Sequence, residues 1–201
     1  NIGRYFQLPP FTALGYTGID GDNRSLRFIQ ADHYVVGSTR FLPWNAKASV
    51  EGFYKSYQYY PLLLRDSISL ATLGGDFGVI GNQLATPTST GRAYGAEFTY
   101  QQKLFKGMFG IAAITLVRSE FADFFGDYIP SSWDNRMIAT FTFGKKFAKN
   151  WELGGQYQHL GGAPYTPLDL ERSANRQNWD VFGRGLPDYS MLNSERFGAF
   201  N

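Results

Sequence analysis

Apolar and polar side chains alternate near the middle of the chain, between Gly91 and Phe121. Across Tyr94–Gln101, one set of positions carries Tyr, Ala, Phe and Tyr, and the positions between them carry Gly, Glu, Thr and Gln. A period of two residues predicts a β-strand with one apolar and one polar face. The run covers about ten residues, which is the length that a tilted strand needs to cross a bilayer.

A turn and a second apolar run follow this strand. The break falls at 104–107, where Lys106-Gly107 supplies a residue that tolerates positive φ. The segment Met108–Val117 then runs back almost without charge. The pattern predicts a long antiparallel hairpin over about 91–121. Aromatic residues near both ends of its apolar face are typical of the girdles of transmembrane barrels.

Two further hairpins are predicted on the same grounds, over about 26–60 and about 136–160. Their short turns lie at 43–45 and 148–150. Alternation is clear in three of these four strands. It is poor in the strand from 26 to 41, so the pattern does not assign the faces of that strand.

The alternation sorts side chains into two surfaces. In a membrane barrel the apolar surface faces lipid and the polar surface faces an aqueous lumen, whereas in a soluble sandwich the apolar surface packs in a dry core. The expected apolar positions are Phe98, Tyr100, Phe141, Phe143, Leu153 and Tyr157. The expected polar positions are Glu97, Gln101, Glu152 and Gln156.

The segments outside the hairpins are predicted to be long loops, over about 61–90, 122–135 and 161–201. The start, 1–25, is also loop-like, because Pro9-Pro10 exclude a central strand. Short turns at one end and long loops at the other are the rule in outer-membrane barrels, which carry long loops outside the cell. We therefore expect an all-β fold, a portion of an antiparallel transmembrane β-barrel with six recognisable strands. Even small membrane barrels need about eight.

Composition narrows the class of protein. Aromatic residues make up 17% of the chain and there are 23 glycines, which suits a sheet that faces lipid or closes into a barrel and argues against disorder. The net charge of +2 is too small to indicate nucleic acid as a partner. The absence of cysteine excludes disulfides and thiolate zinc sites. No apolar run reaches the roughly 18 residues of a membrane helix, and the first residues, NIGRYFQLPPF, lack the basic region, apolar region and cleavage site of a signal peptide.

Several segments together resemble the C-terminal part of the barrel of TonB-dependent outer-membrane receptors of the large carboxypeptidase-regulatory-like type. In chain order they are GRYFQLPPFTALGY, VEGFYKSYQYYPL, GGDFGVIGNQ, GRAYGAEFTYQQKL, LVRSEF, SSWDNRMI and GGAPYTPLDL. The resemblance implies a barrel of about 22 strands filled by an N-terminal plug. It also implies import of a scarce nutrient, with energy delivered by TonB. We expect the 201 residues to be a piece of such a barrel, without the plug, the TonB box or the remaining strands.

The resemblance also implies partners and a location. The expected location is the outer membrane of a Gram-negative bacterium, with outer-membrane lipid around the barrel. TonB would act through an N-terminal region outside these residues, and a surface lipoprotein is a further expected partner. The solute would be a glycan or other small molecule, a peptide or a metal chelate. No cofactor and no nucleic acid are expected. The alternatives are a small outer-membrane barrel that acts as an enzyme or adhesin, and a soluble β-sandwich binding module.

Residues with catalytic potential do not form a recognisable site. Asp32-His33 is the only acid–histidine neighbour pair, and adjacent residues on a strand point to opposite faces. His159 lacks a metal-binding partner two residues away. No Gly-x-Ser-x-Gly elbow or phosphate-binding loop is present. We therefore expect no enzyme and no metal site, and we expect the acids of the long loops to be solvated, Asp134 among them.

Ligand contacts are expected in the long loops, because binding residues concentrate on loops held by a rigid scaffold. Tyr57, Tyr59 and Tyr60 are expected in the aromatic belt of the membrane, and Trp133 suits the belt and a ligand about equally. The loop residues best able to hold a polar solute are Arg65, Asp66, Asp76, Trp133, Asn135, Arg172, Asn175, Arg176 and Trp179.

Overall fold

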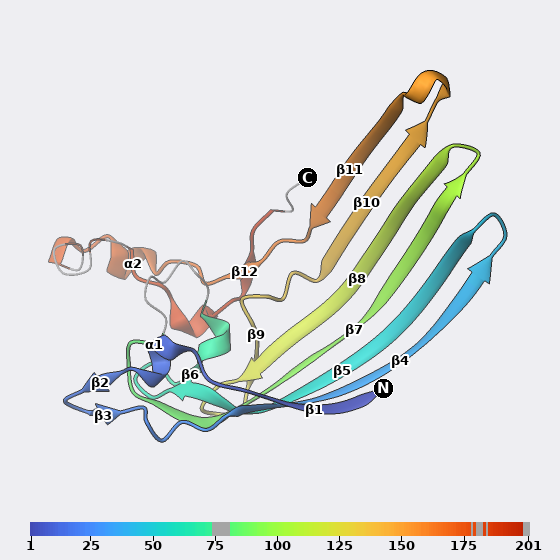
Figure 1. Ribbon diagram of the computed structural model, residues 1–201. Coiled ribbons are helices and arrows are strands. Elements are labelled where there is room, and N and C mark those ends of the chain that lie inside the picture. Colours follow the sequence, from blue (N-terminus) through green and yellow to red (C-terminus); the bar gives the residue numbers. More distant parts are fainter. Residues whose placement is uncertain (74–80, 178, 180–182, 184, 199–201) are drawn as a thin grey trace.

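A computed structural model of the chain describes residues 1–73, 81–177, 179, 183 and 185–198. In this part of the chain, one large antiparallel sheet has a main path of strands in the order β1-β4-β5-β7-β8-β10-β11. Two short strands join its loop end, β6 on β5 and β9 on β8. The path is open, with β1 and β11 at its edges (Figure 1). The prediction of an all-β, antiparallel fold is confirmed.

The strands of the main path are long. Their bounds are β1 Ile2–Gln7, β4 Ile29–Leu42, β5 Ala46–Leu63, β7 Ala85–Phe105, β8 Met108–Ala122, β10 Met137–Lys146 and β11 Glu152–Leu160. The short strands are β2 Thr17–Gly18, β3 Gly21–Asp22, β6 Ile68–Ser69, β9 Tyr128–Pro130, β12 Pro164–Tyr165 and β13 Glu195–Arg196. The helical turns are α1 Phe11–Leu14, η1 Leu70–Thr72, η3 Ala148–Asn150, α2 Leu170–Ser173 and η4 Tyr189–Met191.

Tight turns join β4 to β5, β7 to β8 and β10 to β11, and all three lie at the same end of the sheet (Figure 1). In the β7–β8 turn, Lys106 has φ 48° and Gly107 has φ 79°. Two consecutive residues with positive φ are typical of the two-residue turns whose twist matches that of the flanking strands. We call this the turn end, and the opposite end the loop end.

The register assigns the faces of β4, which the sequence pattern left open. Tyr34 lies opposite Tyr54 of β5, which lies opposite Tyr94 of β7, which lies opposite Arg118 of β8. Directly opposed residues point to the same side of a sheet. Tyr34 and Val36 therefore belong to the surface that carries Tyr94 and Phe98, which we call the apolar face.

Both surfaces continue to the last strands of the sheet. Phe98 lies opposite Ile114, and Phe141 lies between Ala112 and Tyr157, all on the apolar face. The other surface, the polar face, carries Glu51 opposite Glu97 and Thr142 opposite Gln156. The sorting of side chains expected from alternation is thus present in the sheet as a whole.

The N-terminal residues differ from the sequence-based expectation. Ile2–Gln7 was expected to be loop-like, but it forms β1 and pairs with β4 as an edge strand. The two prolines lie beyond this strand, separated from it by Leu8, so they remove no hydrogen bond from its ladder. Pro9-Pro10 argue against a central strand, but they do not exclude an edge strand.

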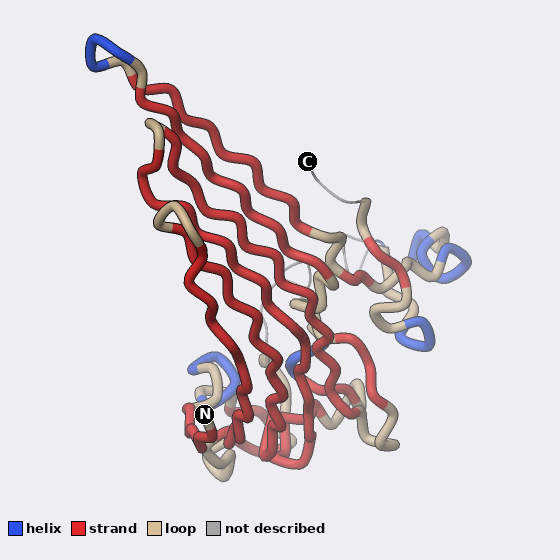
Figure 2. Tube along the Cα trace, turned by 90° about the vertical axis from the view of Figure 1, so that its right-hand side faces the viewer, coloured by secondary structure: helices blue, strands red, loops and turns tan. Residues whose placement is uncertain are grey.

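The expected long loops are also more structured than the pattern indicated. Within 61–90, β5 continues to Leu63 and β7 already begins at Ala85, with β6 and η1 between them. The 122–135 segment contains β9, and the 161–201 segment contains β12, α2, η4 and β13. These pieces are too short to produce a recognisable period. Figure 2 shows the long strands extending away from this loop end.

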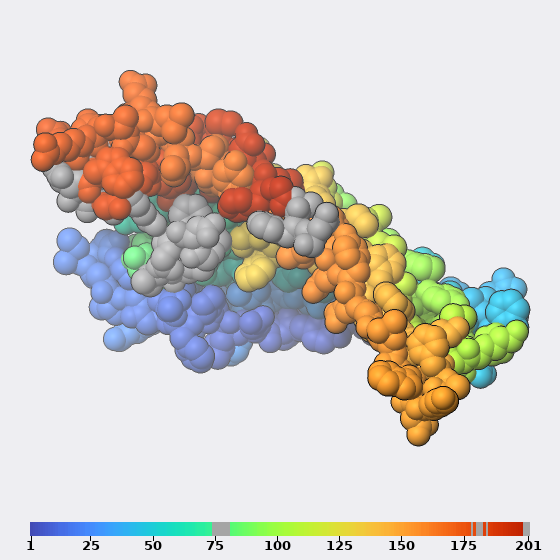
Figure 3. Space-filling view, turned by 90° about the horizontal axis from the view of Figure 1, so that it is seen from above, coloured from blue at the N-terminus to red at the C-terminus, as the bar shows by residue number. Residues whose placement is uncertain are grey.

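The buried core lies at the loop end rather than along the long strands. It is formed by small and aliphatic residues from segments far apart in the sequence: Ala13, Leu63, Ile68, Leu70, Leu73, Ala85 and Leu192. The buried Asn23 side chain ties these segments together. It donates to the backbone oxygens of Ala13 and Gln83 at 2.8 and 2.9 Å and accepts from Ala85 N at 2.8 Å. Figure 3 shows this end as the bulk of the molecule, from which β10 and β11 project.

Candidate functional site

A cleft of about 670 Å³ lies at the loop end, between the polar face and the segments that pack against it. Strands β4, β5 and β8 supply its floor, β1 and the residues after it supply one side, and η1 with Trp133 supplies the other. The lining residues are Tyr5, Phe6, Gln7, Leu8, Pro10, Ile29, Ala31, His33, Tyr57, Tyr60, Ala71, Ser119, Phe121 and Trp133.

Aromatic rings make up much of this cleft. The rings of Tyr5 and His33 have centroids 4.6 Å apart, and those of Tyr60 and Phe121 are also 4.6 Å apart. Tyr57 lies 5.3 Å from the same Phe121 ring. These distances are in the range of favourable ring contacts. The rings therefore form two packed groups in the lining, Tyr5 with His33 and the two β5 tyrosines with Phe121, which together we call the aromatic wall.

Trp133 stands at the rim of the cleft with 74% of its surface exposed. Its backbone is held in place, because Trp133 N donates to Ser131 Oγ at 3.4 Å and Asn135 N donates to Trp133 O at 2.8 Å. Ser131 is itself fully buried and donates from Oγ to Ser119 Oγ at 2.8 Å. A large ring on a fixed backbone beside an aromatic wall is suited to stack on the flat face of a ligand.

The two neighbouring residues Asp32 and His33 do not face each other. Asp32 accepts from Arg4 at 2.6 and 3.1 Å, whereas His33 contacts Tyr5 in the cleft on the other face of the sheet. The described residues contain no group of three or more His, Asp or Glu side chains that could hold a metal ion. No helix in the described ranges is long and apolar enough to cross a membrane.

The sequence-predicted residues Arg65 and Asp66 form a pair with each other. Arg65 Nε lies 3.2 Å from Asp66 Oδ1, and the hydrogen bond raises the pKa of the Arg65 guanidinium above its usual value. Asp66 also accepts from Gln83 Nε2 at 2.7 Å. The pair lies between β5 and β6 and does not line the cleft.

The predicted residues of the last loop lie in and after α2, which stands away from β9 and β10 (Figures 1 and 2). Arg172 Nε lies 3.8 Å from Asp169, Asn175 Oδ1 accepts from Gln177 N at 3.0 Å, and Trp179 Nε1 donates to Ser173 O. Arg176 is exposed beside them. Asp76 lies outside the described residues. The structure thus places Trp133 in the cleft, with Asn135 next to it in sequence, and places the other predicted residues elsewhere.

The expectation for the clustered tyrosines of β5 is wrong in two of three positions. Tyr57 and Tyr60 line the cleft and pack on Phe121, so they do not lie in a belt on the apolar face. A register irregularity between Tyr57 and Tyr60 turns the end of this strand toward the core. The row of rings on the apolar face is formed instead by Tyr34, Tyr54 and Tyr94, with centroid separations of 6.4 and 6.5 Å.

Asp134 is a second correction, because its side chain is fully buried rather than solvated. Its Oδ1 accepts from Ser119 N at 2.9 Å, and its Oδ2 accepts from Arg136 Nε at 3.0 Å and from Arg196 Nη2 at 2.5 Å. It fills the gap on the edge of β8 between β9 and β10. Arg196 comes from β13, so this carboxylate ties the C-terminal segment to the sheet. Its place depends on contacts that no local motif indicates.

No protein-family model matches the chain, and no curated protein matches it. The resemblance to TonB-dependent receptors therefore stays a proposal.

Proposed function

We propose that this chain forms part of the wall of an outer-membrane transport barrel of the TonB-dependent receptor kind, which imports a nutrient across the outer membrane. The observation that carries the proposal is the continuous apolar face of the sheet, bounded by aromatic residues at both ends. Tyr34, Tyr54 and Tyr94 bound it at the loop end, and the stacked rings of Trp44 and Phe105, 5.8 Å apart, bound it at the turn end.

The spacing of the two aromatic rows fits a bilayer. From Tyr94 to Phe105 the strand advances about 36 Å at roughly 3.3 Å per residue. A strand tilted by about 40° in a barrel wall then rises about 28 Å along the barrel axis, close to the ~25 Å band of outer-membrane barrels. The apolar surface between these rows is the part that would face lipid.

A soluble sandwich fits less well. In a sandwich the apolar faces of two sheets interdigitate about 10 Å apart. Here Phe98 is 40% exposed and Leu116 is 53% exposed, and no second large sheet covers the apolar face in the described part of the chain. The segments of the loop end pack instead on the polar face, as they do where loops fold over a lumen.

The proposed barrel contains further strands and a plug, and the 22-stranded form with TonB supplying energy follows from the resemblance. In this arrangement the loop end faces outside the cell and the aromatic cleft opens toward the lumen. A glycan, a peptide or a metal chelate with a flat face suits the cleft, and a surface lipoprotein would bind over the loop end. An enzyme or adhesin of the outer membrane is the second candidate, and among the described residues Asp32 and His33 do not form a catalytic pair that would favour an enzyme.

The full-length protein should require detergent to remain monodisperse. Removing the detergent exposes the apolar face to water, and large contiguous apolar patches are rare on soluble monomers. Size-exclusion chromatography with and without detergent measures this. A monodisperse protein in plain buffer would contradict the membrane assignment and favour the sandwich.

Replacing Trp133 with Ala should weaken ligand affinity by at least about tenfold, because truncation of an aromatic anchor costs roughly 1.4 kcal/mol or more. Trp151→Ala is the matched control, since Trp151 has the same 74% exposure but lies at the turn end. Binding of candidate oligosaccharides and peptides by calorimetry, on the full-length protein, measures both variants. Equal loss of affinity in the two, or loss only in Trp151→Ala, would show that ligand does not bind at the loop-end cleft.

A further inference from the structure

The apolar face holds a groove of about 970 Å³ immediately below the tyrosine row. Its floor is made by small residues, because Val36, Gly52, Ala96 and Leu116 lie side by side in the register and the middle two have little or no side chain. A Cβ added at Gly52 would meet nothing closer than Val36 Cγ1 at 3.9 Å. The groove is therefore open, apolar and wide enough to receive a hydrocarbon chain.

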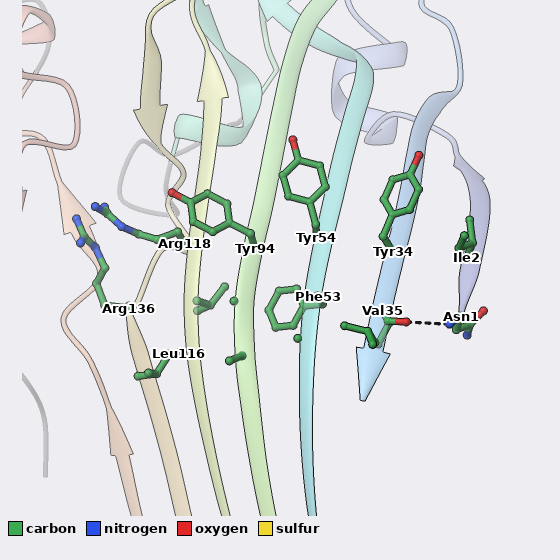
Figure 4. Close-up of a pocket in the computed structure, with 15 residues that line it drawn as sticks. Asn1, Ile2, Tyr34, Val35, Phe53, Tyr54, Tyr94, Leu116, Arg118 and Arg136 are labelled. Atoms are coloured by element: carbon green, nitrogen blue, oxygen red, sulfur yellow. Dashed lines mark hydrogen bonds between the residues drawn. The ribbon is translucent and has the colours of Figure 1, made fainter. Parts of the chain in front are cut away.

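Tyrosine rings border the groove toward the loop end. Figure 4 shows the hydroxyl groups of Tyr34 and Tyr54 pointing toward the loop end and the hydroxyl group of Tyr94 pointing across the sheet toward Arg118. In membrane proteins such rows lie at the depth of the lipid head groups, with the ring in the apolar layer and the hydroxyl in the polar layer.

Arginine side chains continue this row on the next strands. Arg118 is opposite Tyr94 in the register, and Arg136 lies beside it at the start of β10 (Figure 4). Both line the groove, and their side chains are 37% and 45% exposed. In the proposed bilayer, their positive charge lies at the depth of the lipid phosphates.

The charge of these arginines exceeds that of their partners. Arg92, Arg118, Arg136 and Arg196 surround two carboxylates, Glu120 and Asp134, which leaves an excess of two positive charges in the cluster. A cluster of this kind attracts an additional anion.

Free donor groups accompany this excess charge. Among the described residues, the Arg118 guanidinium makes no direct hydrogen bond, and its nearest carboxylate oxygens lie 3.8 and 3.9 Å away. Arg136 uses Nε for Asp134, which leaves its two terminal nitrogens as donors. A guanidinium with unused donors is suited to bind phosphate.

From this juxtaposition we propose a binding site for a phosphorylated membrane lipid of the outer leaflet. The inference rests on the proposed function, because it requires the apolar face to lie in a bilayer. The phosphate head group binds to Arg118 and Arg136, and one acyl chain lies in the groove over Gly52 and Ala96. Charge complementarity selects a phosphorylated lipid over an uncharged one, and the apolar groove selects a lipid over free phosphate.

The test uses the full-length protein in nanodiscs of phosphatidylcholine that contain a few per cent diphosphoryl lipid A, with bound lipid counted by native mass spectrometry. Arg118→Gln should lower lipid A retention at least about tenfold, since a charge-assisted contact is lost. Arg118→Lys, which keeps the charge, should retain an intermediate amount. Gly52→Leu should also lower retention, because its side chain fills the groove while leaving the arginines unchanged.

Arg40→Gln is the matched control. Arg40 lies on the same face but near the turn end, opposite Ala48, and its loss should leave retention unchanged. Folding of each variant is checked by heat-modifiable gel migration. Unchanged retention in both Arg118→Gln and Gly52→Leu would overturn the lipid site, as would full displacement of lipid A by millimolar inorganic phosphate. A wild-type protein that does not enter nanodiscs would contradict the proposed function itself, and so the two failures are distinguishable.

Discussion

Introducing an arginine at Phe98 or Phe141 should destabilise the folded full-length protein by about 2–4 kcal/mol, the cost of a charge near the middle of a bilayer on the lipid face of a barrel. Both side chains belong to the apolar face and lie between the two aromatic rows. Phe98 is flanked by Val50 and Ile114, and Phe141 by Ala112 and Tyr157, so no carboxylate lies opposite either position to neutralise the new charge.

The matched controls are Glu97→Gln and Gln156→Ala on the polar face. All four residues are exposed in the isolated sheet, so accessibility alone predicts similar effects for the two sets. If the polar face lines an aqueous lumen, the controls should change stability by less than about 0.5 kcal/mol. Heat-modifiable gel migration after refolding from urea into detergent micelles or vesicles reports the folded fraction. Equal losses in both sets would contradict the assignment of the faces.

Removing the Asp134 carboxylate should have an effect of similar size at the loop end. Breaking a buried ion pair costs about 3 kcal/mol or more, because the remaining charges lose their partner. In Asp134→Ala, the Arg136 and Arg196 guanidiniums and the Ser119 N–H all lose an acceptor. Since Arg196 holds β13 to the sheet through this carboxylate, the part of the C-terminal segment around β13 should detach before the strands unfold, while Leu192 stays in the core.

Limited proteolysis with mass spectrometry measures the detachment as new cleavage within 161–198. Asp169→Ala is the control, because Asp169 is also a loop carboxylate but caps only α2, where it accepts from Arg172 N at 2.9 Å. Loss of such a cap costs about 1 kcal/mol and should affect α2 alone. An Asp134→Ala protein with wild-type cleavage would show that this carboxylate does not hold the C-terminal segment.

Local side-chain patterns in the sequence predict several elements of this fold. A side-chain period of two follows directly from the geometry of an extended chain, so the faces of β7, β8, β10 and β11 were readable without any knowledge of their neighbours. The β7–β8 turn was readable for the same reason, because positive φ at Gly107 is a local requirement. The short turns therefore fell where the alternation broke, and the all-β class followed from these elements.

The faces of β4 and the strand character of β1 were decided by pairing. The alternation of Ile29–Leu42 is irregular, and only its register with β5 shows that Tyr34 and Val36 share a face with Tyr54. In the same way, Ile2–Gln7 is too short to be recognised by its pattern, and it becomes a strand by completing hydrogen bonds on the edge of β4.

The cleft and the Asp134 cluster were decided by the tertiary structure alone. Trp133 could be named from sequence because a large aromatic in a polar loop is conspicuous, but Tyr5, His33 and Phe121 come from three separate strands, and nothing local indicates that they meet. Asp134 and Arg196 are separated by 62 residues and form their contact only when β13 lies against the sheet. Local conformation depends on neighbours in the chain, and it is readable from sequence. A site made of distant segments depends on how the strands pair and on which buried polar groups then form hydrogen bonds with one another. Both are determined only by the tertiary structure.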